Sequence, residues 1–112
     1  QPAGKLPAIE RHELFVATLA TQIVGFGHAL PGAIAAIFVD PAWLGKGIGR
    51  QLVQHGLRVA QDPTDRPVYL EATLNACSFY ERCGFRCIEQ KVMCRGDSEL
   101  TVVAMVYHGP CQ

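Results

Sequence analysis

The stretch Val39-Asp40-Pro41-Ala42-Trp43-Leu44-Gly45-Lys46-Gly47-Ile48-Gly49-Arg50 decides the fold of this chain. Three glycines within five positions follow a short apolar run, and a helical pattern begins among them. Glycines allow backbone N–H groups to converge, and a helix start offers unpaired donors and a partial positive charge. Lys46 and Arg50 add positive charge on either side, so the stretch predicts a phosphate-binding loop. The helix has its apolar residues at helical spacing, at Ile48, Leu52, Val53, Leu57 and Ala60.

Two well-known phosphate loops fit this stretch poorly. A Walker loop ends in Gly-Lys-Ser/Thr, so that a hydroxyl reaches magnesium, whereas Gly49 is followed by Arg50 and Gln51. The dinucleotide fingerprint needs a third glycine where Arg50 stands and an acidic residue about twenty positions later. Glu71 lies near that offset, but the missing glycine makes this the weaker interpretation.

The loop resembles instead the acyl-CoA loop of the GNAT superfamily of N-acetyltransferases, Arg/Gln-x-x-Gly-x-Gly/Ala. Gly47-Ile48-Gly49 fit this pattern, and the preceding Val-Asp-Pro-x-Trp is often seen in that family. Leu44 departs from it, because the family prefers Arg or Gln there. The departure removes one polar side chain and keeps the backbone donors, so we expect weaker CoA binding rather than none.

A second segment carries the same resemblance. Residues 75–85, Asn-Ala-Cys-Ser-Phe-Tyr-Glu-Arg-Cys-Gly-Phe, are similar to the family's later motif, in which an Asn precedes Tyr-Glu-x-x-Gly-Phe. Two motifs in the right order and spacing are more specific than either alone. Together the resemblance covers roughly residues 13–107, most of the chain.

The pattern of apolar runs and turn residues predicts a mixed α/β (α+β) fold. An irregular arm over residues 1–12 precedes three antiparallel strands, and a helix ends before Asp62-Pro63, since proline cannot continue it. Gly84 is expected in the left-handed position after the second helix. The strands are expected at 14–19, 22–29, 33–40, 67–73, 86–95 and 99–107, and the helices at 47–61 and 76–83.

This order matches the later part of the GNAT fold, a mostly antiparallel sheet whose C-terminal half runs β-α-β-α-β-β. The resemblance implies a parallel step from the third strand to the fourth, with the two strands splayed apart to admit the cofactor. The family's first strand and helices have no counterpart before Leu14. A truncated product and a minimal family member both remain open.

Length and composition indicate a single globular domain over residues 1–112. The chain is 49% hydrophobic and has a formal net charge of zero, so no basic footprint favours nucleic acid or an anionic membrane. It shows no signal-peptide pattern and no apolar run near the ~20 residues of a membrane span. The spacing of its five cysteines and four histidines does not suggest a metal site. We expect reduced thiols and a cytoplasmic protein.

The resemblance implies a binding site for acetyl-CoA as co-substrate. The pantetheine amides would pair with the backbone of Phe38 and Val39. Asn75 lies where the family places an amide near the cofactor, although a helix N-cap is an equally open interpretation of that residue. The pyrophosphate would sit on the backbone amides of Gly45, Lys46, Gly47, Ile48, Gly49 and Arg50.

The implied reaction is direct acetyl transfer to a primary amine. By resemblance Tyr80 protonates the leaving thiolate, although a tyrosine that only packs on the sheet remains an alternative. The family's basic glutamate corresponds here to Ala36. Glu71 is therefore the candidate base, acting through a water, unless it pairs with a surface cation, and His28 is a further candidate. Direct transfer needs no covalent nucleophile, so Cys77 and Cys83 are interpreted as core residues.

Two functions follow from these residues. The first is an N-acetyltransferase for a small-molecule or peptide amine, whose identity the sequence leaves open. The second is a non-catalytic CoA-binding or interaction module, favoured by Leu44, Ala36 and the missing N-terminal elements.

The bare strand edge near Leu14 and the apolar final hairpin predict a homodimer, because soluble monomers rarely leave such surfaces uncovered.

Overall fold

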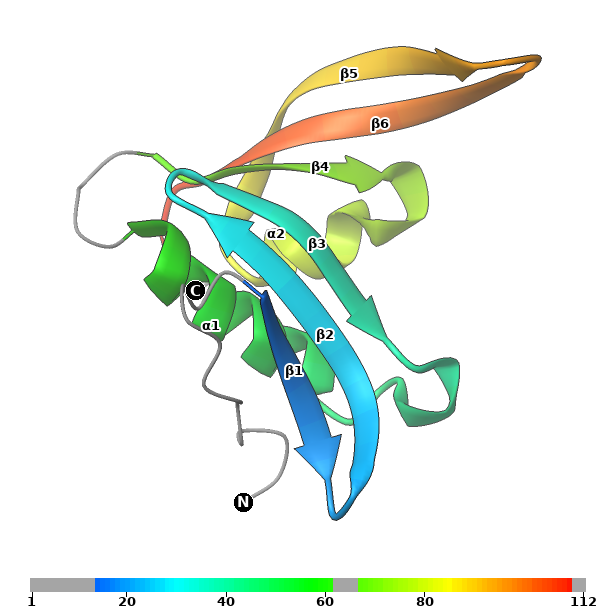
Figure 1. Cartoon of the computed structure of the whole chain (residues 1–112). Coiled ribbons are helices and arrows are strands. Elements are labelled where there is room, and N and C mark those ends of the chain that lie inside the picture. Colours follow the sequence, from blue (N-terminus) through cyan, green and yellow to red (C-terminus); the bar gives the residue numbers. More distant parts are fainter. Residues whose placement is uncertain (1–13, 62–66, 110–112) are drawn as a thin grey trace. The chain divides into compact units, whose positions relative to one another are not determined.

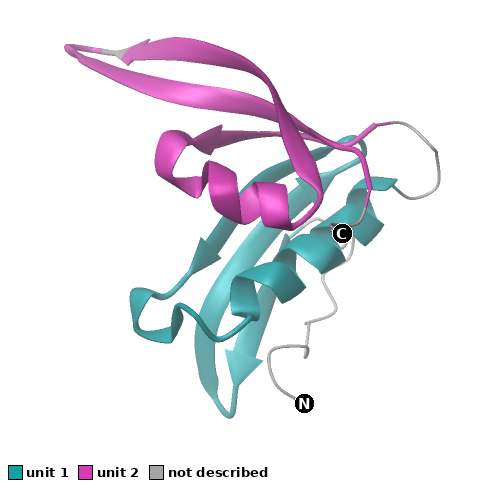
Figure 2. Cartoon of the chain, turned by 180° about the vertical axis from the view of Figure 1, so that it is seen from behind, with its two compact units in different colours: residues 1–66 teal, residues 67–112 magenta. Residues whose placement is uncertain are grey.

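The computed structural model describes residues 14–61 and 67–109. The chain divides into two compact units, residues 1–66 and 67–112, coloured teal and magenta in Figure 2. The fold is a mixed one of two α-helices and mostly antiparallel strands, as the sequence predicts. The single domain and the parallel, splayed step between the units remain predictions. The expected arm and the expected stop at Asp62-Pro63 lie outside the described residues.

Unit 1 is an antiparallel meander with one helix (Figure 1). Its strands are β1 (Leu14–Leu19), β2 (Gln22–Leu30) and β3 (Ala33–Val39), and its helix is α1 (Ile48–Gln61). These bounds confirm the predicted elements to within one residue. Two-residue turns join the strands, so neighbours in sequence pair in space.

Helix α1 packs on one face of these strands because its apolar stripe matches theirs. Gly56 lies at a close approach, where an added Cβ would be 3.3 Å from Cδ1 of Ile34 and 3.5 Å from Cζ of Phe15. A helix seated this closely fixes the position of its N-terminus relative to the end of β3. The buried helix residues are Ile48, Leu52, Val53, Gly56, Leu57 and Ala60.

Unit 2 is a second antiparallel arrangement, with β6 (Ser98–Tyr107) between β4 (Tyr69–Thr73) and β5 (Phe85–Arg95). The long hairpin of β5 and β6 confirms the predicted pair (Figure 1). Strand β4 is two residues shorter than expected at its start. The short helix α2 (Cys77–Arg82) packs against β5.

Gly84 ends the second helix as predicted. Its φ of +102° lies in the region that favours glycine, and its N–H donates to the carbonyl of Glu81 at 3.1 Å. A Cβ at this position would overlap the carbonyl oxygen of Gly109. The chain therefore turns sharply from α2 into β5, and this turn sets where the side chains of α2 lie in the unit.

Two short 3₁₀ turns were not predicted. They are η1 (Pro41–Trp43), which follows β3, and η2 (Leu74–Ala76), which follows β4. Neither described helix is long and apolar enough to cross a membrane.

Candidate functional site

The glycine loop forms an open backbone turn in front of α1. Gly45 and Gly47 have φ of +77° and +84°, a conformation that residues with a Cβ rarely adopt. The N–H of Gln51 donates to the carbonyl of Gly47 at 3.2 Å, so the first helical turn begins at that glycine. The preceding amides, at the helix N-terminus, have no partner within the helix. These are the unpaired donors that the sequence predicts for a phosphate.

The space in front of this loop is empty of the described residues. A Cβ built at Gly45 or Gly47 would meet nothing within 4 Å. Lys46 and Arg50 are exposed beside the loop and bring two positive charges to it. The arrangement is able to bind an anion through backbone donors, the helix dipole and both cations.

A capped turn holds the start of this loop. The Asp40 carboxylate accepts a hydrogen bond from the N–H of Ala42 at 2.9 Å, and the Asp40 N–H donates to the carbonyl of Val24 at 2.8 Å. The N–H of Trp43 donates to the Asp40 carbonyl at 2.8 Å. Asp40 thus joins β2, η1 and the loop. The signal for this role was present in the sequence as Asp-Pro, a typical turn-initiating pair.

We expect Asp40→Ala to weaken binding of CoA by about 2- to 30-fold, because loss of a helix-capping side chain costs ~0.5–2 kcal/mol. Asp40→Asn is the matched control, since its amide oxygen still accepts from Ala42. Isothermal calorimetry with CoA measures both variants. Equal affinity of Asp40→Ala and the unchanged chain would show that the capped turn does not order the loop.

Phe38 and Val39 occupy the end of β3, just before this turn. Val39 is half-buried, whereas 48% of the Phe38 side chain is exposed. The Phe38 ring stacks on that of Phe26, its cross-strand partner, with a centroid distance of 5.4 Å. Among the described strands of unit 1, β3 pairs with β2 alone.

Tyr80 lies in α2 within an aromatic cluster of unit 2. Its ring meets Phe79 and Phe85 edge to face, with centroid distances of 5.0 and 6.1 Å. Burial, with a smaller contribution from Cys83, raises the pKa of Tyr80 to about 12. The phenol therefore keeps its proton at neutral pH and is able to donate it.

The acetyltransferase (GNAT) domain family matches residues 10–87, which is more than half of the chain. The chain belongs to the GNAT acetyltransferases. The uncharacterized N-acetyltransferase YafP of Escherichia coli is 29% identical over 89 residues, which make up 79% of this chain and 56% of YafP.

Solved structures share the fold of this GNAT chain. A GCN5-related N-acetyltransferase from Rhodopseudomonas palustris matches it with a TM-score of 0.79 at 22% identity, covering 84% of this chain and 59% of that one. An acetyltransferase of Bacillus subtilis in complex with CoA gives a TM-score of 0.68 at 18% identity, covering 84% and 74%. The chain thus spans less than two thirds of the length of YafP and of the Rhodopseudomonas protein.

The GNAT motif residues fall into two groups, one in each unit. Phe38, Val39 and the loop 45–50 belong to unit 1, where consecutive elements bring them together. Glu71, Asn75 and Tyr80 belong to unit 2, on β4, η2 and α2 respectively.

Asn75 is not a helix N-cap, so that interpretation of the sequence is wrong. The residue before α2 is Ala76, and the residue before η2 is Thr73. The 3₁₀ turn places Asn75 in its middle, where its side chain is exposed and hydrogen-bonded to no other described residue. A role of this free amide toward the cofactor stays a prediction.

Glu71 pairs with a surface cation, as one interpretation of the sequence held. Its Oε2 lies 2.6 Å from Nζ of Lys91 across the strands of unit 2, and both side chains are exposed. The hydrogen bond and the charge of Glu71 raise the pKa of Lys91. The ion pair engages the carboxylate that was the candidate base, and its role in proton transfer remains a prediction.

Cys77, near Tyr80, shows no sign of an activated nucleophile. Cys77 donates through Sγ to the Thr73 carbonyl at 3.5 Å, and its pKa is raised by burial and by the neighbouring Cys87 and Glu81. A raised pKa lowers the thiolate fraction, which is the reactive form. Across residues 14–61 and 67–109, no three His, Cys, Asp or Glu side chains gather as a metal site would require.

Proposed function

We propose that this GNAT chain is an N-acetyltransferase that moves an acetyl group from acetyl-CoA directly to a primary amine. The observation that carries the proposal is the open glycine loop at the N-terminus of α1, where the helix start offers backbone donors and two cations are exposed. This cradle fits a pyrophosphate, and the Bacillus subtilis relative was solved with CoA.

In this proposal each motif residue has a chemical role. The amides of Gly45, Lys46, Gly47, Ile48, Gly49 and Arg50 hold the pyrophosphate, and the backbone of Phe38 and Val39 pairs with the pantetheine arm. Asn75 offers its free amide to the cofactor. The amine nitrogen attacks the thioester carbon, the C–S bond breaks, and the thiolate takes its proton from Tyr80.

The test is product formation with a panel of amines. The panel comprises 2-phenylethylamine, spermidine and a peptide with a free amino terminus, each incubated with acetyl-CoA. Mass spectrometry of the amine is the better readout, because Cys87 and Cys94 are exposed free thiols that would react with a thiol dye. Acetylated product from at least one amine supports the proposal, and CoA binding without product supports the alternative below.

The alternative is a non-catalytic CoA-binding module. Three observations favour it: Leu44 is 63% exposed where the family has a polar residue, Ala36 lacks a carboxylate, and Glu71 is engaged by Lys91. Both functions predict that CoA binds, which calorimetry measures. The amine panel separates the enzyme from the binding module, since only the enzyme consumes acetyl-CoA.

Partners and location belong to the same proposal. The acceptor is a small-molecule or peptide amine rather than nucleic acid or a membrane, because the net charge is zero. Cys77, Cys87 and Cys94 carry free thiols, which suits a reducing cytoplasm.

We expect a homodimer at micromolar concentration. The hairpin of β5 and β6 exposes Ile88, Val92, Met93 and Leu100, and apolar surface of this kind favours association. Light scattering after gel filtration measures the mass, and Val92→Glu should shift it toward the monomer. A monomeric mass for the unchanged chain would rule out this assembly.

A further inference from the structure

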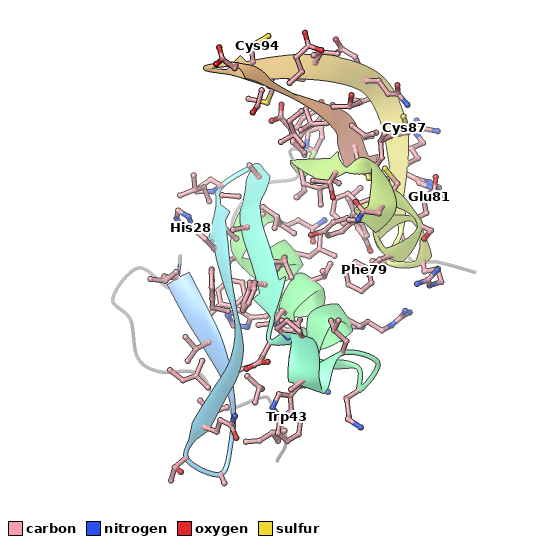
Figure 3. The ribbon with its side chains drawn as sticks, turned by 90° about the vertical axis from the view of Figure 1, so that its right-hand side faces the viewer. His28, Trp43, Phe79, Glu81, Cys87 and Cys94 are labelled. Atoms are coloured by element: carbon pink, nitrogen blue, oxygen red, sulfur yellow. The ribbon has the colours of Figure 1, made fainter. Side chains whose placement is uncertain are left out.

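The strands of unit 1 have one face away from α1, and this face carries a single titratable side chain. The helix side holds buried Phe15 and Ala17, together with the glycines at 25 and 27 that face them across the strand pair. The opposite side holds His28, which Figure 3 shows on the other side of the strands from the helix. His28 is the only acid or base in the sequences of β1, β2 and β3.

The neighbours of His28 leave its imidazole open. Leu14 faces it from β1 and Ala36 faces it from β3, both as direct cross-strand partners. The Ala36 side chain is small, and the position is exposed. No described residue makes a hydrogen bond to the imidazole, and the side chain is only half-buried. A ring in this setting is free to accept a proton from a molecule that reaches the face.

The β-sheet ladder is broken beside His28. His28 pairs with Ala36, whereas the next residue of β2, Ala29, pairs with Ile34. Ala35 therefore has no partner on β2 and is the inserted residue of a β-bulge. Bulges bend a strand, leave the inserted residue unpaired and are over-represented beside active sites. Both Ala35 and Ala36 are exposed at this point. The bulge therefore bends β3 beside the imidazole.

His28 shares its face with the end of β3 that is proposed to hold the pantetheine arm. Phe26 and Phe38 are direct cross-strand partners, each two residues from the His28–Ala36 pair on its own strand. Because a strand rises ~3.3 Å per residue, Ala36 and Phe38 lie about 7 Å apart along β3. A proton acceptor needs hydrogen-bond reach of its proton, directly or through one water, so the amine would bind beside the His28–Ala36 pair.

We propose that His28 is the proton acceptor for the amine that this chain acetylates; this inference rests on the proposed acetyltransferase function. As the amine nitrogen bonds to the thioester carbon, its surplus proton passes to the imidazole, and the half-exposed ring returns it to water. The thiolate leaves with the carbon–sulfur electron pair and takes a separate proton from Tyr80. The Tyr80 phenolate then takes a proton back from water, so atoms and charge balance without any further reactant.

The surroundings favour His28 over Glu71 for this task. Glu71 is already held by Lys91, whereas His28 has no acid or base beside it on β1, β2 or β3. Arg50, His55 and Arg58 belong to α1, which covers the other face, and Asp40 is engaged with Ala42. Histidine is also the side chain that most often serves as a general base in proteins.

The test compares His28→Gln with His108→Gln, a control at an exposed histidine of unit 2. Acetyl-CoA and the panel amine that the unchanged chain converts fastest are the substrates. We expect kcat of His28→Gln to fall at least about 100-fold, the lower end for general-base catalysis, with CoA affinity within two-fold. The acidic limb of the kcat–pH profile should disappear in this variant and stay in His108→Gln.

Chemical rescue separates a proton acceptor from a merely structural residue. Added imidazole should restore part of the turnover of His28→Ala and leave that of the unchanged chain as it was. The role of His28 would be overturned, and the proposed function kept, by turnover of His28→Gln within two-fold of the unchanged chain. An acidic limb that persists in the kcat–pH profile of His28→Gln would have the same consequence. An unchanged chain that acetylates no amine would overturn it together with the proposed function.

Discussion

Gly47→Glu should abolish most of the binding of CoA, raising its dissociation constant at least about 100-fold. The added carboxylate would occupy the open space in front of the loop, where nothing lies within 4 Å of a Cβ. It would bring a negative charge against the pyrophosphate, and such like-charge contacts cost several kcal/mol. Isothermal calorimetry with CoA measures the loss. The affinity of the unchanged chain should also fall with added salt, because Lys46 and Arg50 contribute to it.

A second glycine provides the control for this variant. Gly96 lies in the β5–β6 turn with φ of +59° and nothing within 4 Å of its Cβ position. Gly96→Glu therefore adds the same charge and a similar backbone strain, ~1–2 kcal/mol, at a site distant in sequence from the loop. Only Gly47→Glu should lose its affinity for CoA. Equal affinity for CoA in both variants would show that the loop does not bind the pyrophosphate.

The local parts of the fold were predictable from sequence because local rules decide them. Alternation and turn residues set the strands of unit 1, and the apolar stripe from Ile48 to Ala60 set α1. Gly84 was placed correctly since its position after α2 tolerates no Cβ. Each of these features depends on residues that are close together in the sequence.

The parts that sequence reasoning missed depend on short turns or on distant residues. Asn75 looked like an N-cap, but the η2 turn moves the helix start beyond it. The partner of Glu71 is Lys91, twenty residues later and on a different strand, and only the register of β4 and β5 on β6 brings them together. The pairing of His28 with Ala36 likewise follows from a bulge that no single-strand pattern reveals.

Tyr80→Phe should lower turnover by about 10²–10⁴-fold and leave CoA affinity unchanged, because the variant loses only a proton donor. The ring contacts with Phe79 and Phe85 remain, and the Tyr80 hydroxyl has no hydrogen-bond partner among the described residues to lose. Tyr107→Phe is the matched control, since Tyr107 packs on the same Phe85 at a centroid distance of 5.3 Å. Steady-state kinetics with the best panel amine compares the three proteins.

The raised pKa of Tyr80 adds a second, independent signature. An unfolded tyrosine ionises near pH 10, whereas burial raises the pKa of Tyr80 to about 12 in the folded chain. The unfolded state thus releases its proton first, so stability that is fully present below about pH 10 is lost as the pH rises toward 12. Thermal unfolding between pH 9 and 11 should decline less steeply in Tyr80→Phe than in Tyr107→Phe. Equal turnover in the two variants would show that the Tyr80 ring is structural and that another group protonates the thiolate.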